Sequence, residues 1–172
     1  MEDDRFKMVK KYNPVLADCI RKVDLNQVDE THYTRRAVGC LILTKDGKIL
    51  LQHRPLNWRT FPGCLATFGG GIEVNELPLN ALIRELKEEL GADAKEQDII
   101  SLGAITESAT NHLELIYQFF WHDKAGTITG CYECEARYYE SIAEAFEHPK
   151  IMDDVRWLLE ICQAKGLLNP EL

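Results

Sequence analysis

Residues 70–92 read GGIEVNELPLNALIRELKEELGA, and this stretch decides how the chain is organised. Pro78 suits the first turn of a helix and Gly91 is a typical stop, so the pattern predicts a helix that ends at Leu90. The apolar residues of this helix recur at helical spacing and form a stripe that we expect to face a core. The stripe consists of Leu79, Leu82, Ile83, Leu86 and Leu90.

A group of three glutamates lies mostly off that stripe. Positions i, i+3 and i+4 are held by Glu85, Glu88 and Glu89, so their side chains project to one side of the helix. Like charges at this spacing destabilise a helix unless a cation lies among them. Mg²⁺ takes oxygen ligands and usually keeps waters and substrate phosphates in its shell. Taken alone, the acidic run would indicate a solvated helix face; its distance from Gly70 and Glu76 favours a site that holds metal ions for phosphate chemistry.

The same segment resembles the signature box of the Nudix hydrolases. That box reads Gly, five residues, Glu, seven residues, Arg-Glu, an aliphatic residue, any residue, Glu-Glu, any residue, Gly and an aliphatic residue. Every specified position is filled, with only Ala92 small for its place: Gly70, Glu76, Arg84, Glu85, Leu86, Glu88, Glu89, Gly91 and Ala92. Such a pattern is far more specific than a lone glycine-rich loop. A looser resemblance runs over residues 36–139, and Phe68-Gly69-Gly70 replaces the common Pro-Gly-Gly, which bears on the loop shape.

The resemblance implies roles for the residues of the box. Glu88 and Glu89 would be metal ligands, and Glu85 would be a further ligand or the general base. Arg84 would pair with a box glutamate and hold its carboxylate in place. Gly69 would offer its backbone carbonyl to the metal, because the absence of a side chain allows close approach. The metal would be Mg²⁺ or Mn²⁺.

Further site residues are expected outside the box. In this family an acidic ligand often comes from a downstream loop, and we take Glu133 as the candidate ahead of Glu135, although either fits an ordinary loop carboxylate. Arg54 is a candidate for a phosphate contact, and Trp58 and Phe68 are candidates for stacking on a base. Arginines of this kind are more often surface residues, and such aromatics are more often core or loop anchors.

The rest of the pattern predicts an α/β fold. Expected strands are 37–44 and 49–54 around a hairpin turn at Asp46-Gly47, then 99–107, a central strand over 113–121, and a short strand over 137–139. Helices are expected from Ser141 and over 153–165. Interleaved strands and helices favour a mixed sheet between helices, and the resemblance implies a Nudix-type α/β/α sandwich.

The domain organisation follows from length and pattern. At 172 residues the chain fits one domain with an appended element. We assign 37–172 to the Nudix domain and 1–36 to an N-terminal extension, within which 15–23 fits either a short helix or a strand and turn.

Composition excludes several partners. The net charge of −8 argues against a nucleic acid duplex, but bound metal would neutralise the phosphates of a nucleotide. There is no run of about 18 apolar residues to span a membrane and no secretory signal.

Six cysteines without an export signal indicate reduced thiols in a cytoplasm. The pair Cys131 and Cys134 lacks the second pair that a zinc site needs. The oligomeric state stays open, with a homodimer among the alternatives.

The expected function is metal-dependent hydrolysis of a diphosphate bond in a nucleoside diphosphate linked to a variable group. Two alternatives stay open. Residues 34–63 also resemble isopentenyl diphosphate isomerase, in which Cys64 would lie near the reacting carbon, and a sensor that only binds a nucleotide is a third reading. The complete set of box glutamates favours hydrolysis, but the pattern does not identify the leaving group.

Overall fold

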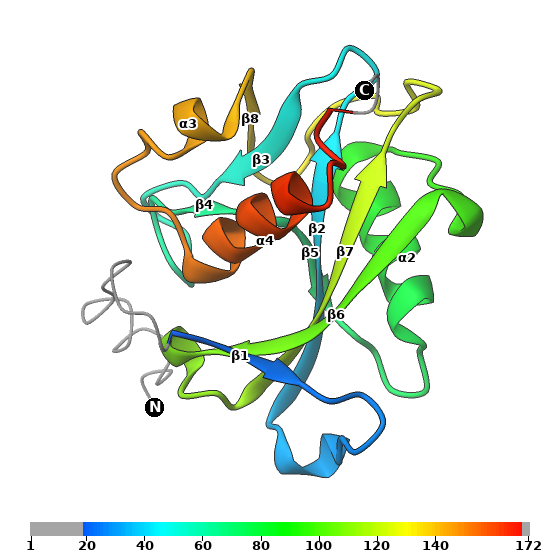
Figure 1. Ribbon diagram of the computed structural model, residues 1–172, viewed down its shortest axis with the longest axis vertical. Helices are drawn as coiled ribbons and strands as arrows, with labels where there is room; N and C mark the ends of the chain where they lie inside the picture. Colours follow the sequence, from blue (N-terminus) through cyan, green and yellow to red (C-terminus); the bar gives the residue numbers. More distant parts are fainter. Residues whose placement is uncertain (1–18, 170–172) are drawn as a thin grey trace.

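The computed structural model describes residues 19–169, whose centre is a mixed β-sheet (Figure 1). Within this part of the chain the sheet has eight strands in the order β1-β6-β7-β2-β3-β4, with β5 paired to β2 and β8 paired to β3. β2 and β7 run parallel and the other pairs are antiparallel. The strands are β1 (Ile20–Val23), β2 (Arg35–Leu43), β3 (Ile49–His53), β4 (Leu65–Ala66), β5 (Phe68–Gly71), β6 (Ile99–Glu107), β7 (Glu114–His122) and β8 (Glu135–Tyr139).

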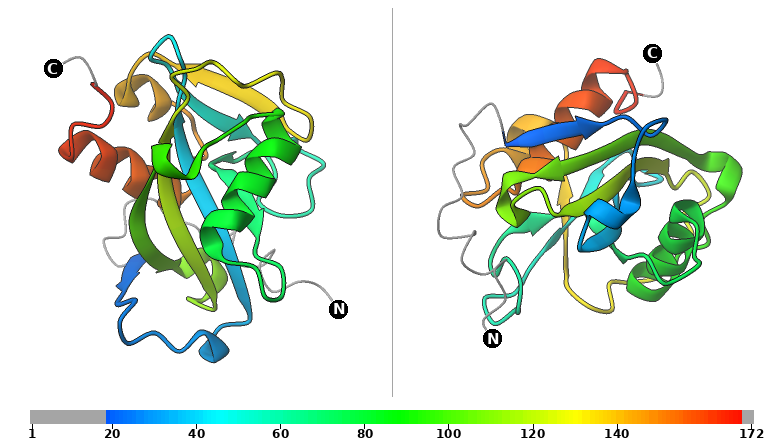
Figure 2. Two further views of the ribbon diagram at one scale, coloured as in Figure 1. Left: turned by 90° about the vertical axis from the view of Figure 1, so that its right-hand side faces the viewer. Right: turned by 90° about the horizontal axis from the view of Figure 1, so that it is seen from below.

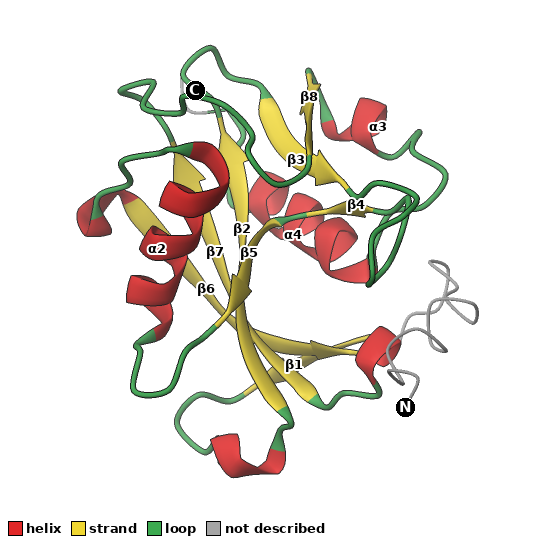
Figure 3. Ribbon diagram, turned by 180° about the vertical axis from the view of Figure 1, so that it is seen from behind, coloured by secondary structure: helices red, strands yellow, loops and turns green. Residues whose placement is uncertain are grey.

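Two long helices cover opposite faces of this sheet. α2 (Pro78–Leu90) lies on one face and α4 (Asp153–Ala164) on the other, as the views from the side and from behind show (Figure 2, Figure 3). The short helix α3 (Ile142–Ala145) follows β8. This arrangement confirms the predicted α/β/α sandwich around a mixed sheet. Among residues 19–169, no helix has the length and apolar character that crossing a membrane requires.

Strand β2 divides the interior into two cores because its side chains alternate between the faces. Val38, Cys40 and Ile42 pack under α2, where Leu82, Leu86 and Leu90 are fully buried. The intervening side chains of β2, such as Leu41 and Leu43, pack under α4. Both faces of β2 are therefore covered, which explains why the strand reads as one continuous apolar run.

The sequence pattern predicted most of these elements. The helix over 78–90 is confirmed, with Gly91 in the left-handed conformation at its end, and so are the strand over 99–107 and the central strand near 113–121. Strands β4 and β5 were not predicted, because they are short and lie in a loop-like stretch.

The N-terminal part joins the sheet. Of the undecided stretch 15–23, residues 20–23 form β1, which pairs with β6, and 15–18 lie outside the described residues. The division at 36/37 stays a prediction; β1 and the start of β2 lie on its N-terminal side.

The packing of α2 predicts a stability effect. Leu86 is fully buried, so Leu86→Ala is expected to lower the free energy of unfolding by about 2–5 kcal/mol. Leu77, just before the helix, is 67% exposed, and Leu77→Ala serves as the control with little expected change. Denaturant melts of both variants would measure the difference. Equal stability of the two variants would mean that α2 does not pack through this face.

Candidate active site

The site is built where β5 meets α2. Gly69 has a φ of 144°, and a β-carbon there would collide with the carbonyl of Val38 on the neighbouring strand. Its backbone N–H donates to Glu89 Oε1 at 2.9 Å. A β-carbon on Gly70 would lie 2.6 Å from the Glu85 carboxyl. The glycines thus let the strand approach the glutamates of the helix closely.

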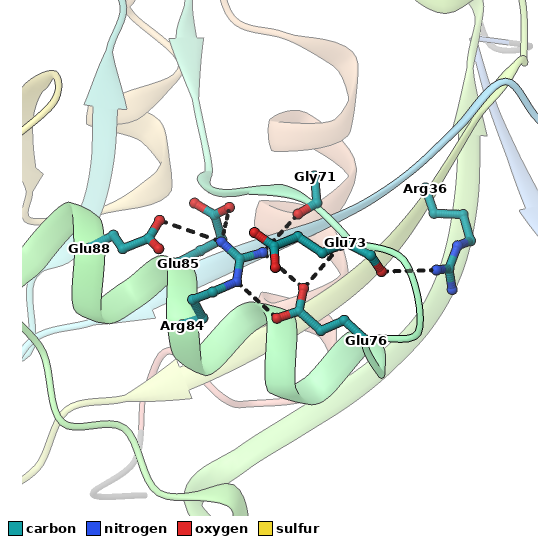
Figure 4. Close-up of polar contacts among 7 residues, drawn as sticks. All are labelled: Arg36, Gly71, Glu73, Glu76, Arg84, Glu85 and Glu88. Carbon is teal, nitrogen blue, oxygen red and sulfur yellow. Dashed lines mark hydrogen bonds and ion pairs between the residues drawn. The ribbon is translucent and has the colours of Figure 1, made fainter.

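Arg84 joins the polar residues of the site into one network (Figure 4). Its Nε and Nη2 donate to the two carboxylate oxygens of Glu76 at 2.8 and 2.9 Å, a bidentate pair. Its Nη1 donates to Glu85 Oε1 at 2.9 Å and reaches Glu88 Oε2 at 3.4 Å. Nη2 also donates to the carbonyl of Gly71 at 3.0 Å. In this structure the cation among the carboxylates is therefore the guanidinium of Arg84.

The loop between β5 and α2 is closed by Glu76. The backbone N–H of Glu73 donates to Glu76 Oε1 at 3.0 Å, and Arg36 Nη2 donates to the Glu73 carbonyl at 3.4 Å. Hydrogen bonds from Arg84 and from the Glu73 backbone lower the pKa of Glu76 to about 2. Glu76 therefore stays ionised and orients Arg84 at any ordinary pH.

Glu89 is buried rather than solvated, which corrects the expectation that the box glutamates share an open face. Its side chain is turned towards β5, and the residue is only 3% exposed. Burial raises its pKa to about 8, and the charges of Glu85 and Glu133 add to the shift. Burial also raises the pKa of Glu85, against the effect of Arg84. An ionised Glu89 is costly here unless a cation approaches it.

The chemistry of these donors fits a hard divalent cation, since all are carboxylate oxygens. Within residues 19–169, however, no three His, Cys, Asp or Glu side chains gather closely enough to hold a metal ion. The three carboxylates are suitable ligands for such a cation. In this structure, however, Arg84 holds Glu85 and Glu88, and the backbone of Gly69 holds Glu89.

Glu133 lies near this group although it is far along the chain. Its charge raises the pKa of both Glu85 and Glu89, and the adjacent Tyr132 N–H donates to the Glu89 carbonyl at 2.9 Å. Glu135, the other carboxylate considered, instead pairs with Arg137 Nε at 3.0 Å. The structure thus brings Glu133 to the box helix.

The three predicted substrate-binding residues have different positions. Phe68 is fully buried in the core under α2, so the expectation that it stacks on a base is wrong; β5 alternation directs it inward. Trp58 is partly exposed in the loop after β3. Arg54 Nη1 donates to the hydroxyl and the carbonyl of Thr60 at 2.8 and 3.1 Å. Its charge lowers the pKa of both Glu89 and Asp154, so Arg54 lies between the box and the start of α4.

Two cysteine features can now be assigned. Cys131 Sγ donates to the Cys134 carbonyl at 2.8 Å, and burial raises the pKa of both thiols, that of Cys134 to about 11. Cys64 is buried in the core under α4, and burial raises its pKa as well. An inward, protonated Cys64 weakens the interpretation of the chain as an isomerase.

Sequence reasoning missed a second group of carboxyls. Glu107 and Asp154, both buried, line a cavity of about 80 Å³ on the α4 side of the sheet. They come from the end of β6 and the start of α4. The signal in the sequence that could have revealed this group was Glu107, an acidic residue at the end of the mostly apolar strand β6.

The raised pKa of Glu89 predicts how stability depends on pH without metal. The folded chain holds this proton up to about pH 8, while an unfolded glutamate loses it near 4.5. Its contribution is therefore largest below about pH 4.5 and is lost as the pH rises towards 8. Melting curves of metal-free protein should show Glu89→Gln gaining on the wild type between pH 5 and 8. A melting difference that is the same at both ends of this range would refute the assignment.

Fold and site together define a Nudix protein, and the comparisons agree. A NUDIX domain model matches residues 33–159, so the chain belongs to the Nudix family of hydrolases. The CTP pyrophosphohydrolase of Escherichia coli strain K12 is 33% identical over 137 residues, which are 77% of this chain and 95% of that protein. The ADP-ribose pyrophosphatase of Methanocaldococcus jannaschii is 31% identical over 121 residues, 67% of this chain and 70% of that protein.

Solved structures show the same fold. The E. coli ORF135 protein superposes with a TM-score of 0.60 at 27% identity and covers 84% of this chain and 99% of its own. A MutT protein from Bacillus halodurans gives a TM-score of 0.56 at 21% identity, covering 78% and 82%. The second likeness concerns the fold alone.

Proposed function

We propose that this chain hydrolyses a phosphoric anhydride bond in a nucleoside diphosphate linked to a variable group, with Mg²⁺ or Mn²⁺. The carrying observation is the buried Glu89, placed beside Glu85 and the Arg84 network on a complete Nudix box. Relatives named CTP pyrophosphohydrolase and ADP-ribose pyrophosphatase support hydrolysis of small nucleotides over isomerisation.

The proposed metal donors come from α2, from β5 and from the loop before β8. Glu88, Glu89, the carbonyl of Gly69 and Glu133 are the proposed donors, with Glu85 as a further one. A bound divalent cation neutralises phosphate charge and lowers the pKa of water. The burial of Glu89 supports its assignment, because a cation would offset the cost of its ionisation.

Glu85 is the proposed general base. It is half-buried beside Gly70, and burial raises its pKa, which brings a carboxylate closer to the pH at which it transfers protons well. Arg84 is a positioning residue: it holds Glu85 from one side while Glu76 holds Arg84 from the other. Arg54 and Trp58 remain candidates for substrate contact.

We also propose that the protein is located in the cytoplasm. The supporting observation is that the half-buried thiols of Cys131 and Cys134 are not joined to each other.

A substrate panel tests this function. The purified chain would be incubated with nucleoside triphosphates, sugar nucleotides, dinucleoside polyphosphates and, separately, isopentenyl diphosphate, with Mg²⁺ or Mn²⁺, in ¹⁸O-labelled water. Mass spectrometry should find one ¹⁸O atom in one of the two phosphate products. Nucleotide binding without cleavage would indicate the sensor instead, and rearrangement of isopentenyl diphosphate without phosphate release would indicate the isomerase.

A further inference from the structure

The loop between β5 and α2 exposes two of its apolar side chains. Val74 is 88% exposed and Leu77 is 67% exposed. The pairing of β5 with β2 ends at Gly71 and Ala37, where this loop begins. The loop lines an open groove together with η1 (Glu30–His32), a short 3₁₀-helix that precedes β2. A segment with few buried apolar contacts is held weakly by packing, so polar contacts largely decide its position.

Arg36, the second residue of β2, holds this loop with both its backbone and its side chain. Its carbonyl accepts from the Ile72 N–H at 3.0 Å. Its Nη2 donates to the carbonyl of Glu73 at 3.4 Å, as the close-up shows (Figure 4). Its Nη1 forms an ion pair with Glu30 Oε2 at 3.0 Å. The guanidinium of Arg36 therefore joins the loop to η1.

Glu30, the partner of Arg36, is itself held in place. Tyr117 on β7 donates its hydroxyl to Glu30 Oε1 at 2.5 Å. Burial raises the pKa of Tyr117 to about 12, and the bond to Glu30 adds to the shift, so the phenol keeps its proton at ordinary pH. Asp29 Oδ1 accepts from the Thr31 N–H at 3.0 Å and caps η1. The carboxylate that receives Arg36 is therefore fixed both by the sheet and by the capped helix.

Hydrogen bonds continue from the loop to the proposed general base. The Glu73 N–H donates to Glu76 Oε1 at 3.0 Å, and Glu76 accepts the two bonds of Arg84. Arg84 in turn donates to Glu85 Oε1 at 2.9 Å. A displacement of the Glu73 peptide would therefore move the carboxylate that orients Arg84.

We propose that Arg36 is a positioning residue for the hydrolysis, which fixes the Glu73 peptide and through it the orientation of Arg84. This role rests on the proposed function and adds to it a residue that contacts neither the metal nor the reacting phosphates. Glu30 keeps the guanidinium in place and precedes residues 33–159, which the NUDIX domain model matches. The segment before β2 is therefore part of the support of the active site.

The Arg36 side chain is not needed to keep β2 in the sheet. β2 pairs with β7 along its nine residues and also with β3 and β5. The side chains of Arg36 and Glu30 are 24% and 41% exposed, and ion pairs with this exposure contribute little to stability. Loss of the Arg36 side chain should therefore leave the fold intact and change the rate.

The first test is Arg36→Gln, measured by steady-state kinetics with the best substrate of the panel at saturating Mg²⁺. We expect kcat to fall about tenfold while KM stays near the wild-type value. Lys48→Gln is the control, because it breaks an exposed ion pair with Glu140 away from the box, and it should keep the wild-type kcat. A wild-type kcat in Arg36→Gln, or a change confined to KM, would overturn the positioning role.

A double-mutant cycle tests whether Arg36 acts through Arg84. Residues that act through one network have effects that do not add. Once Arg84→Lys is present, Arg36→Gln should therefore lower kcat little further. Losses that multiply in full in the double variant would show two independent effects and would contradict the proposal.

A measurement without metal or substrate keeps this role separate from the proposed function. In chelator-treated wild-type protein, the Arg84 Nε–H, which donates to Glu76 at 2.8 Å, should be protected from exchange with water in NMR spectra. Its protection should be lost in Arg36→Gln and in Glu30→Gln, and kept in Lys48→Gln. Unchanged protection in the first two variants would overturn the proposal, whatever the substrate panel shows. Lost protection in a chain that cleaves no substrate would support Arg36 as the anchor of Arg84 and remove the hydrolysis alone.

Discussion

Glu89→Gln is expected to lower kcat/KM at least about tenfold in the presence of Mg²⁺. Glu89 is buried and poised beside Glu85 and Glu133, and an amide there cannot ionise to bind a cation. Glu88→Gln should give a loss of similar size. Steady-state rates over a range of Mg²⁺ concentrations would measure both effects, and Glu96→Gln, an exposed change outside the site, is the matched control.

The two variants should remain folded. Metal-free Glu89→Gln should melt no lower than the wild type at pH 8, because it removes a buried carboxylate that is costly to ionise. Near-normal rates of both variants at saturating Mg²⁺ would remove Glu88 and Glu89 from the proposed metal centre.

The second large effect is expected for Arg84→Lys. Arg84 makes a bidentate pair with Glu76 and also holds Glu85, Glu88 and the Gly71 carbonyl. A lysine keeps the charge but not the planar fork. We expect kcat to fall about tenfold to a hundredfold, with a smaller change in KM, because the substitution mainly removes the orientation of Glu85.

Acid sensitivity separates this positioning role from a general loss of stability. Hydrogen bonds from Arg84 hold the pKa of Glu76 at about 2, so its stabilising effect is present above about pH 4.5 and is lost as the pH falls towards 2. In Arg84→Lys this loss should begin at a higher pH. A variant with wild-type kcat, or with an unchanged acid melting profile, would contradict the assigned role.

Local signals in the sequence predicted the elements that carry strong patterns. The helix over 78–90 has a proline start, a glycine stop and an apolar stripe, and these agree with its packing. β5 was missed because Phe68-Gly69-Gly70-Gly71 has no alternating pattern; its pairing with β2 depends on contacts distant in sequence. The same loss of pattern explains why Phe68 stayed a candidate for stacking on a base.

The sequence predicted most of the residues that form the site, but only part of their arrangement in space. Helical spacing placed Glu85, Glu88 and Glu89 near one another, and the expected pairing of Arg84 with a box glutamate is observed with Glu76. Spacing along one helix cannot reveal that a strand will bury Glu89. Glu107 and Asp154 lie 47 residues apart in the chain, since 154 − 107 is 47, and meet at one cavity through the tertiary fold alone.

The central claim is that this Nudix chain hydrolyses a phosphoric anhydride with a metal held by the box carboxylates. The most direct measurement is turnover of the best substrate of the panel as a function of pH at several Mg²⁺ concentrations, with a chelated sample beside them. Metal and protons compete for the same oxygens. Raising Mg²⁺ should therefore shift the acid limb of the rate profile to lower pH, and chelation should abolish turnover until Mg²⁺ or Mn²⁺ is restored. An acid limb that stays fixed over a wide Mg²⁺ range, or turnover that survives complete chelation, would contradict the account.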